Sequence, residues 1–168
     1  MPDVPSQLAS DGLLQHIVEG VPIRIFWKDR DLRYLGCNTL FAQDAGVEGP
    51  AEVVGRTDFD LAWRAQAELY RADDRAVMES GEARIDFEEP QTSPSGDLLW
   101  LRTSKVPLLD DSGAVIGVLG IYDDITARKQ VELRLRESEE RYQRLFDSSP
   151  DPCWIIDASN RFILCNVA

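Results

Sequence analysis

The sequence predicts an α+β domain in which helices cover one face of a five-stranded antiparallel sheet, and a long helix leads out of the domain. Two extended segments, a helix and three further extended segments follow one another along the chain. Connections of hairpin length make neighbouring strands antiparallel. Residues 22–38 also return as residues 150–166 at a constant offset of 128 residues, and a repeat of this length has the size of a domain.

The repeat divides the chain into four predicted parts. We expect an N-terminal helical cap at residues 1–20, a complete domain at 21–125, a connector helix at 126–147 and the start of a truncated second copy at 148–168. That start comprises the first two strands of the second copy, a hairpin that is marginally stable without the rest of its sheet.

The first strand pair is expected at residues 23–28 and 32–37, on either side of the turn Asp29-Arg30-Asp31. A short amphipathic helix at residues 7–19 precedes this pair. Residues 38–59 are expected to be irregular or to form short helices, because three glycines and a proline interrupt them.

The best helix inside the domain is predicted at residues 61–80. Gly81 is well placed to end it in a left-handed conformation. Its small and apolar residues recur at helical spacing, which predicts the buried face: Ala65, Leu69, Ala72 and Ala76. The adjacent carboxylates Asp73 and Asp74 point apart on a helix, so we interpret them as part of a solvated face.

Three further strands are predicted at residues 83–89, 98–108 and 115–123, and turns rich in serine, glycine and aspartate separate them. In the first of these strands Ile85 and Phe87 alternate with acidic residues. This alternation predicts that the two apolar side chains face the core.

The connector helix begins near Thr126, which is a suitable N-cap. Its heptad positions are Val131, Leu135, Ser138, Tyr142 and Leu145. This seam supports two interpretations: the helix packs on its own domain, or it pairs with a second copy in a parallel dimer.

The composition is acidic, with a net charge of -12. Residues 126–146 carry +2, so the rest of the chain carries -14, and on this basis we expect neither nucleic acid nor a membrane surface as a partner.

Cys37, Cys153 and Cys165 lack CxxC spacing, which argues against a disulfide framework or a metal site and favours a reducing cytoplasm. No apolar run approaches the length of a membrane span, although a longer protein that contains this chain could be anchored elsewhere.

Several motifs together resemble the PAS domain family. They are Asn38 at the end of the first strand pair, Gly55-Arg56-Thr57, Trp100-Leu101, and Ile116-Gly117-Val118 followed by Asp124-Ile125-Thr126. The resemblance implies a PAS fold with a small-molecule cleft between sheet and helices. It also implies a sensor module upstream of an effector, such as a histidine kinase of a two-component system or a cyclic-dinucleotide enzyme.

Three tryptophans, Trp27, Trp63 and Trp100, lie in the first domain, either lining such a cleft or belonging to an ordinary core. The residues around Trp27 and Asp58 resemble the flavin-binding PAS domain of MmoS-type redox sensor kinases. That resemblance implies noncovalent FAD, with another ligand or no ligand as the alternative. The cleft residues that we expect are Trp27, Asn38, Asp58, Trp63, Trp100 and Ser104.

Other PAS chemistries are disfavoured by the residues. The stretch that begins at Gly55 reads Gly-Arg-Thr-Asp-Phe-Asp and contains no cysteine, so flavin–cysteine photochemistry is not expected. The sole histidine, His16, lies outside the predicted core and is expected at the surface, which disfavours haem.

The signal is expected to pass from the sheet to the connector helix, with Asp124 available to Arg102 or Lys105 and with Thr126 capping the helix. The predicted function is a cytoplasmic sensory module that relays redox or ligand state to an effector domain. The alternative is a ligand-free module for dimerisation and relay. No catalytic motif is present, so we expect no enzyme in this chain, and we expect a homodimer through its N-terminal and connector helices.

Overall fold

The computed structural model describes residues 6–152 and 154–166, with side chains from Gly12 onward except that of Leu164. Cys153 and the ends of the predicted cap and second copy, residues 1–5 and 167–168, lie outside the described residues. The chain forms two compact units that meet after Thr126, and each is described by itself.

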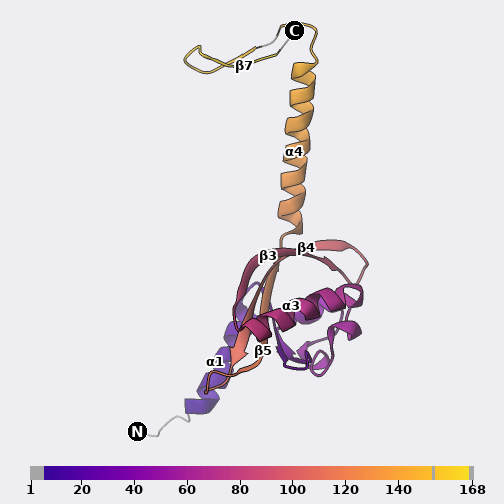
Figure 1. Cartoon of the computed structure of the whole chain (residues 1–168), viewed down its shortest axis with the longest axis vertical. Coiled ribbons are helices and arrows are strands. Elements are labelled where there is room, and N and C mark those ends of the chain that lie inside the picture. Colours follow the sequence, from indigo (N-terminus) through magenta and orange to yellow (C-terminus); the bar gives the residue numbers. More distant parts are fainter. Residues whose placement is uncertain (1–5, 153, 167–168) are drawn as a thin grey trace. The chain divides into compact units, whose positions relative to one another are not determined.

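The first unit contains the predicted five-stranded sheet (Figure 1). Its strands have the order β2-β1-β5-β4-β3, and every neighbouring pair is antiparallel. The strands are β1 (Arg24–Asp29), β2 (Tyr34–Cys37), β3 (Arg84–Thr92), β4 (Leu98–Leu109) and β5 (Val115–Asp124). The predicted α+β fold is therefore confirmed.

Helices α2 (Thr39–Asp44) and α3 (Ala67–Ser80) lie on one face of this sheet, with α3 running across it (Figure 1). Between them come three 3₁₀ turns, η1 (Pro50–Glu52), η2 (Asp58–Asp60) and η3 (Arg64–Gln66). Helix α1 (Ser6–Gly20) lies against the opposite face, where its Leu14 and Val18 share a groove with Trp27. The predicted helix 61–80 is shorter than expected because Leu61 is extended and η3 forms a separate turn before α3. Gly81 ends α3 in the left-handed conformation, with φ of 67°.

The predicted buried face of α3 is wrong. The positions Ala65, Leu69, Ala72 and Ala76 are exposed, whereas Ala67, Tyr70, Asp74 and Val77 are buried. The true face has helical spacing too, but it includes a carboxylate, and a search for apolar periodicity passes over such a face.

The inward side of β3 also differs from the prediction. Ile85 is 56% exposed, and the inward residues are the polar Glu89 and Gln91. A bulge before Phe87 explains the difference, because Asp86 has φ of 53° there and the extra residue resets the alternation of the strand.

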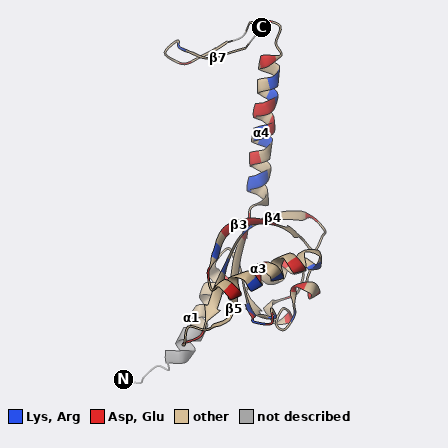
Figure 2. Ribbon diagram, viewed as in Figure 1, with Lys and Arg blue, Asp and Glu red and all other residues tan. Residues whose placement is uncertain are grey.

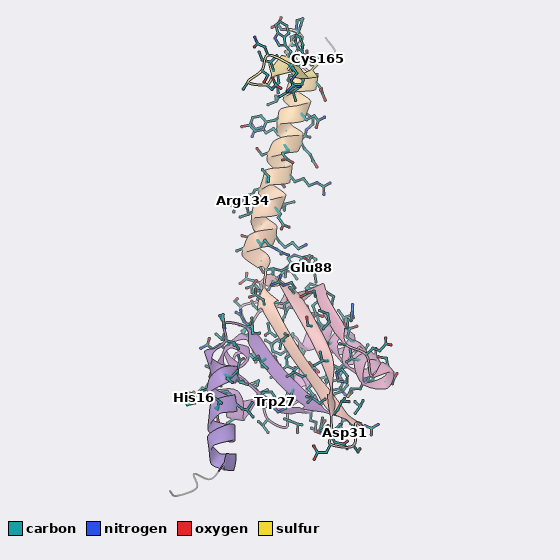
Figure 3. All side chains as sticks on the ribbon, turned by 90° about the vertical axis from the view of Figure 1, so that its left-hand side faces the viewer. His16, Trp27, Asp31, Glu88, Arg134 and Cys165 are labelled. Carbon is teal, nitrogen blue, oxygen red and sulfur yellow. The ribbon has the colours of Figure 1, made fainter. Side chains whose placement is uncertain are left out.

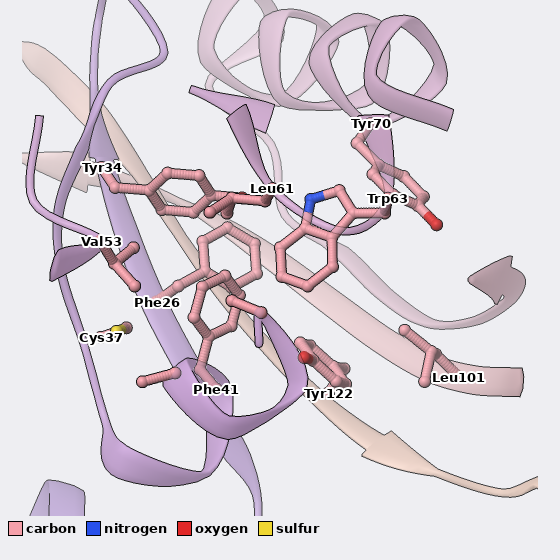
Figure 4. Close-up of a cluster of buried hydrophobic side chains, with 12 residues drawn as sticks. Phe26, Tyr34, Cys37, Phe41, Val53, Leu61, Trp63, Tyr70, Leu101 and Tyr122 are labelled. Atoms are coloured by element: carbon pink, nitrogen blue, oxygen red, sulfur yellow. The ribbon is translucent and has the colours of Figure 1, made fainter. Parts of the chain in front are cut away.

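The core between sheet and helices is a cluster of aromatic rings (Figure 4). Phe41 of α2 lies at its centre, with ring-centroid distances of 5.1 Å to Phe26, 5.3 Å to Tyr34 and 5.3 Å to Trp63. Tyr122 of β5 completes the cluster at 6.0 Å from Phe41. Edge-on and tilted rings of this kind fill the space that a wide cleft would need.

The second unit contains α4 (Thr126–Asp147), which continues from the first unit, and the hairpin of β6 (Trp154–Ile156) and β7 (Phe162–Cys165). Lys and Arg alternate with Asp and Glu along α4 (Figure 2), and Arg136 contacts Glu140 at 3.0 Å. The apolar heptad residues Val131, Leu135, Tyr142 and Leu145 are exposed in the chain.

The hairpin reproduces the turn of the first strand pair. Leu32 and Asn160, 128 residues apart, have positive φ values of 62° and 61°. The carboxylates of Asp29 and Asp157 each accept two backbone N–H bonds from the residues two and four places further on. The sequence repeat is therefore also a repeat of local geometry.

A test of sheet packing is Gly117→Ala in β5. An added Cβ would lie 2.1 Å from the carbonyl oxygen of Lys28, which is backbone and cannot swing aside. We expect the free energy of unfolding to fall by about 1–3 kcal/mol in urea denaturation. Gly49→Ala is the control, because nothing lies within 4 Å of the added Cβ, and it should stay within about 1 kcal/mol of the wild type. Equal stability of the two variants would contradict the close packing at Gly117.

Candidate functional site

Four charged side chains from four elements meet in the interior and form what we call the charge cluster: Lys28 of β1, Asp58 of η2, Asp74 of α3 and Lys105 of β4. Each is at most 2% exposed. Lys28 Nζ lies 2.7 Å from Asp58 Oδ2 and 2.6 Å from Asp74 Oδ2. Lys105 Nζ lies 2.6 Å from Asp74 Oδ1. Asp74 therefore bridges both ammonium groups.

Two further groups complete these contacts. The Tyr34 hydroxyl donates to Asp58 Oδ1 at 2.8 Å, and Lys105 Nζ donates to the carbonyl oxygen of Tyr70 at 3.1 Å. Burial, together with the neighbouring charge of Asp58, raises the pKa of Tyr34 well above its ordinary value, so the hydroxyl keeps its proton. Burial alone would raise the pKa of Asp74, but the ammonium groups of Lys28 and Lys105 outweigh it and hold that pKa below its ordinary value.

The charge cluster corrects the interpretation of Asp73 and Asp74 as a solvated face. Asp73 pairs with Arg84 near the surface, but Asp74 is fully buried. Two ammonium groups inside a protein require such compensation, because an unpaired buried charge is expensive.

A small cavity of about 30 Å³ lies beside the charge cluster. Its lining combines three members of the cluster, all except Asp74, and the aromatic core with polar side chains of β3 and β4: Glu89, Gln91 and Thr103. Glu89 is 7% exposed, and burial raises its pKa although Lys105 and a hydrogen bond from Thr103 lower it in part. Within the part of the chain that the structure describes, Glu89 Oε2 has no hydrogen-bond partner that meets strict geometry.

Two of the six predicted cleft residues line this cavity, namely Asp58 and Trp63. Asn38 is fully buried, but its side chain forms hydrogen bonds with backbone groups instead of lining the cavity. Its Oδ1 accepts from the N–H of Phe41 at the start of α2, and its Nδ2 donates to the carbonyl oxygen of Ile23. Asn38 is therefore a structural residue and does not face the cavity.

The prediction for Trp27 is wrong because successive strand residues face opposite sides of the sheet. Phe26 and Lys28 point into the core, and Trp27 lies on the other face (Figure 3). There it packs over Gly36 and lines an apolar groove of about 660 Å³ that also includes Leu14 and Val18 of α1.

The same alternation places Trp100 and Ser104 outside the cavity. Trp100 is 37% exposed, and Ser104 Oγ accepts from the N–H of Asp86 at the bulge of β3. The inward residues of this part of β4 are Leu101, Thr103 and Lys105.

The predicted FAD does not fit this site. A cavity of about 30 Å³ holds one or two water molecules, whereas pockets for cofactor-sized ligands measure about 300–1,000 Å³. Trp63, which we expected among the residues that line a flavin cleft, packs edge-on against Phe41 at 5.3 Å. His16 is exposed on α1 (Figure 3), and its Nδ1 contacts the carbonyl oxygen of Gly12, so the described structure also offers no axial ligand for haem in the cleft.

The junction between the sheet and α4 is built on Trp100. Its carbonyl oxygen accepts from the N–H of Ile125, and its N–H donates to Thr126 Oγ1, both at 2.8 Å. Asp124 Oδ1 accepts from the N–H of Thr126, also at 2.8 Å. The side chain of Asp124 thus accepts from the first backbone N–H of α4, whereas the hydroxyl of Thr126, the predicted N-cap, accepts from the sheet residue Trp100.

The proposed partners of Asp124 also need correction. Lys105 pairs with Asp74 in the interior, and Arg102 lies 3.9 Å from Asp123 instead of reaching Asp124. Arg24 of β1 lies at the same distance from Asp123. The reason is again strand alternation, since Arg102 and Lys105 point to opposite faces of β4.

The chain belongs to the PAS fold family, since the profile of that family matches residues 18–130. A second profile, described as a PAS domain, matches residues 140–166. The uncharacterized protein y4lL of Sinorhizobium fredii is 29% identical over 160 residues, which are 94% of this chain and 19% of that protein. The chain therefore spans about a fifth of the length of this curated relative.

Solved structures share the fold. VqmA of Vibrio cholerae, in a complex with a ligand and DNA, superimposes with a TM-score of 0.62 at 23% identity, over 71% of this chain and 51% of VqmA. An RNA-binding light-oxygen-voltage receptor superimposes with a TM-score of 0.63 at 21% identity, over 86% of this chain and 42% of the receptor. At such identities the likeness concerns the fold alone.

These structures overturn our exclusion of nucleic acid as a partner. One protein with this fold binds DNA, and another is described as RNA-binding. The exclusion failed because a PAS domain is one part of a longer protein, and the charge of that part does not decide what the other parts bind.

Among the described residues, no helix is long and apolar enough to cross a membrane.

Four residues of the site were not predicted from the sequence: Lys28, Asp74, Glu89 and Thr103. A weak signal existed in the first strand, where Lys28 follows Phe26 at a spacing of two and therefore shares its inward face. Asp74 offered no comparable signal, because surface helices commonly carry such residues.

Asp74→Asn tests the charge cluster. This isosteric change leaves Lys105 without its carboxylate, so we expect the free energy of unfolding to fall by about 3–5 kcal/mol in urea denaturation. The double variant Asp74→Asn/Lys105→Met should recover much of the loss, whereas Asp73→Asn should cost about 1 kcal/mol or less. A single variant as stable as the wild type would contradict the bridging role of Asp74.

The same variant predicts a pH dependence. The pKa of Asp74 is lower in the folded than in the unfolded chain, so its contribution is complete above the unfolded pKa of about 4 and is lost as pH falls through the folded pKa. The stability gap between wild type and Asp74→Asn should therefore be constant above about pH 5 and shrink below about pH 4. A gap that widens on acidification would contradict this sign.

Absorption spectroscopy tests the flavin result. Because the cavity is about 30 Å³, we expect the purified protein to absorb only in the protein band, before and after addition of dithionite. A yellow two-banded spectrum that bleaches on reduction would show that the cleft opens far beyond this geometry.

Proposed function

We propose that this PAS domain is the sensory input part of a longer signalling protein, and that it passes the state of its cleft along β4 and β5 to the start of α4. A histidine kinase is the effector that the family resemblance favours. The DNA complex of VqmA supports a nucleic-acid-binding output as the second kind of effector. In either case the whole protein extends well beyond this chain, as the length of its curated relative supports.

The observation that carries this proposal is that one strand serves both the cavity and the junction. On its inward side, β4 presents Thr103 and Lys105 to the cavity. Three residues before Thr103, the backbone of Trp100 holds Ile125 and Thr126 through two hydrogen bonds of 2.8 Å. A small shift of β4 therefore moves the groups that define where α4 begins.

The neighbouring strand β5 has the same double role. Tyr122 lines the cavity, and its hydroxyl donates to Asp44 Oδ2 at 3.1 Å. Asp123 follows directly and faces Arg24 and Arg102 at the surface. Changes on either side of the sheet thus reach Tyr122 and Asp123, which lie four and three residues before the start of α4 at Thr126.

The second candidate function is a ligand-free relay, in which a neighbouring domain moves the sheet. The small cavity favours it, because the aromatic rings and the charge cluster already fill most of the interior. In this case the sheet and its junction with α4 act in the same way, but the input comes from outside the cleft.

Hydrogen exchange tests the relay through β4. Thr103→Val changes one inward group of the strand without changing its shape, and we expect the exchange rates of the Ile125 and Thr126 amides to change by several-fold. Leu109→Ala is the control, because Leu109 is an exposed residue at the far end of β4. Identical exchange at the junction in wild type and both variants would refute the relay.

A further inference from the structure

We propose that Arg24 of β1 is a positioning residue of the relay, which couples helix α2 at the cavity to Asp123 beside the start of α4. Its guanidinium group stands between two carboxylates, Asp44 on α2 and Asp123 on β5. This inference rests on the proposed sensory function, since it adds a route from the helical layer to the same junction.

Helix α2 joins the cavity to the carboxylate that holds Arg24. Phe41 lines the cavity and lies at the centre of the aromatic core. Asp44, the last residue of α2, lies three residues further along, within one helical turn. Both residues belong to one short helix, so a displacement of Phe41 moves the carboxylate of Asp44 as well.

Asp44 is held by two partners from the sheet. Its Oδ2 accepts from Arg24 Nε at 2.9 Å and from the Tyr122 hydroxyl at 3.1 Å. Arg24 and Tyr122 lie opposite each other in the register of β1 and β5. The side chains of Arg24 and Asp44 are only 21% and 20% exposed, so water screens their attraction less than it screens a pair at the surface. The guanidinium group therefore follows Asp44 when α2 moves.

The same guanidinium group reaches towards a second carboxylate. Arg24 Nη1 lies 3.9 Å from Asp123 Oδ1, and Arg102 Nη2 lies 3.9 Å from Asp123 Oδ2. Both distances are at the outer limit for an ion pair, and the side chain of Asp123 is 40% exposed, so neither contact is strong in this state. When Asp44 withdraws, Asp123 is the carboxylate on which Arg24 closes. Arg24 thus has two discrete arrangements, which form the two-state element that coupling between distant sites requires.

Asp123 stands next to the first contact of α4. The following residue, Asp124, accepts from the N–H of Thr126 through its side chain at 2.8 Å, and the N–H of Ile125 donates to the sheet at the same distance. A contact that tightens at Asp123 therefore pulls on the backbone that presents both groups.

Asp44→Asn tests the coupling, because it removes the charge of Asp44 and keeps an acceptor for Tyr122. We expect Arg24 to turn to Asp123, and the exchange rates of the two amides at the helix start to change by about fivefold or more, measured by NMR. Asp111→Asn is the matched control, because it removes the same charge from an exposed turn between β4 and β5. The same spectra show whether each variant is folded.

Two double variants show whether the effect passes through Arg24. The Asp123→Asn background lacks the second carboxylate, and the Arg24→Gln background lacks the shared cation. In both backgrounds we expect Asp44→Asn to change the rates at the helix start by less than about twofold, because one member of the coupled set is absent.

Coupling between two sites is reciprocal, so the experiment also runs from the exposed side. Asp123→Asn changes a surface carboxylate and should leave the fold intact. We expect it to change the exchange rate of the Ala45 amide, whose N–H donates to the carbonyl oxygen of Phe41, by about fivefold or more. Asp111→Asn should leave this rate unchanged. This measurement decides the proposal even if Asp44→Asn does not fold.

The role of Arg24 would be overturned by rates at the helix start that are the same in Asp44→Asn and wild type. It would also be overturned by a full response to Asp44→Asn in either double variant, or by an unchanged Ala45 amide in Asp123→Asn. The experiment on Thr103→Val stays independent. A junction that responds to Thr103→Val but not to Asp44→Asn would refute the route through Arg24 and leave the relay through β4 standing.

Discussion

The contact on which the domain depends is the bridge that Asp74 of α3 makes between Lys28 of β1 and Lys105 of β4. It is the point where the helical layer and two strands of the sheet are held by charge instead of by apolar contact alone. Because both ammonium groups are at most 2% exposed, neither sheet strand keeps its position without a carboxylate from the helix side. The position of α3 over the sheet, and with it the shape of the cavity, follows from this requirement.

The charge cluster also decides what the cavity is able to hold. Its members and the rings around Phe41 occupy the space that a flavin would need, and they leave a volume of about 30 Å³. The volume that remains is bordered by polar groups, namely the carboxylate of Glu89, the amide of Gln91 and the hydroxyl of Thr103. A cavity that is small and polar in this way discriminates by hydrogen bonds and charge more than by apolar area.

Strand alternation connects the cavity to the signal path and also explains which site residues were predicted correctly. Asp58 and Trp63 come from turns on the helical side, where the predicted cleft and the actual cavity coincide. Trp27, Trp100 and Ser104 were predicted from residue type, but the alternation of side chains along β1 and β4 places them on the face of the sheet opposite the cavity. The junction residues Asp124 and Thr126 were located correctly in the chain, yet their partners were not, because Arg102 and Lys105 point to opposite sides of β4.

The sequence by itself determined the succession of strands and helices along the chain, the turn at Asp29, the end of α3 at Gly81 and the repeat that recurs at Asp157. These features are local, since short-range spacing and turn chemistry specify them. Only the tertiary structure decided that Lys28 lies against Asp58 and Asp74, which are 30 and 46 residues away. Lysine and aspartate are surface residues by default, so their burial depends on partners that only the folded chain brings together.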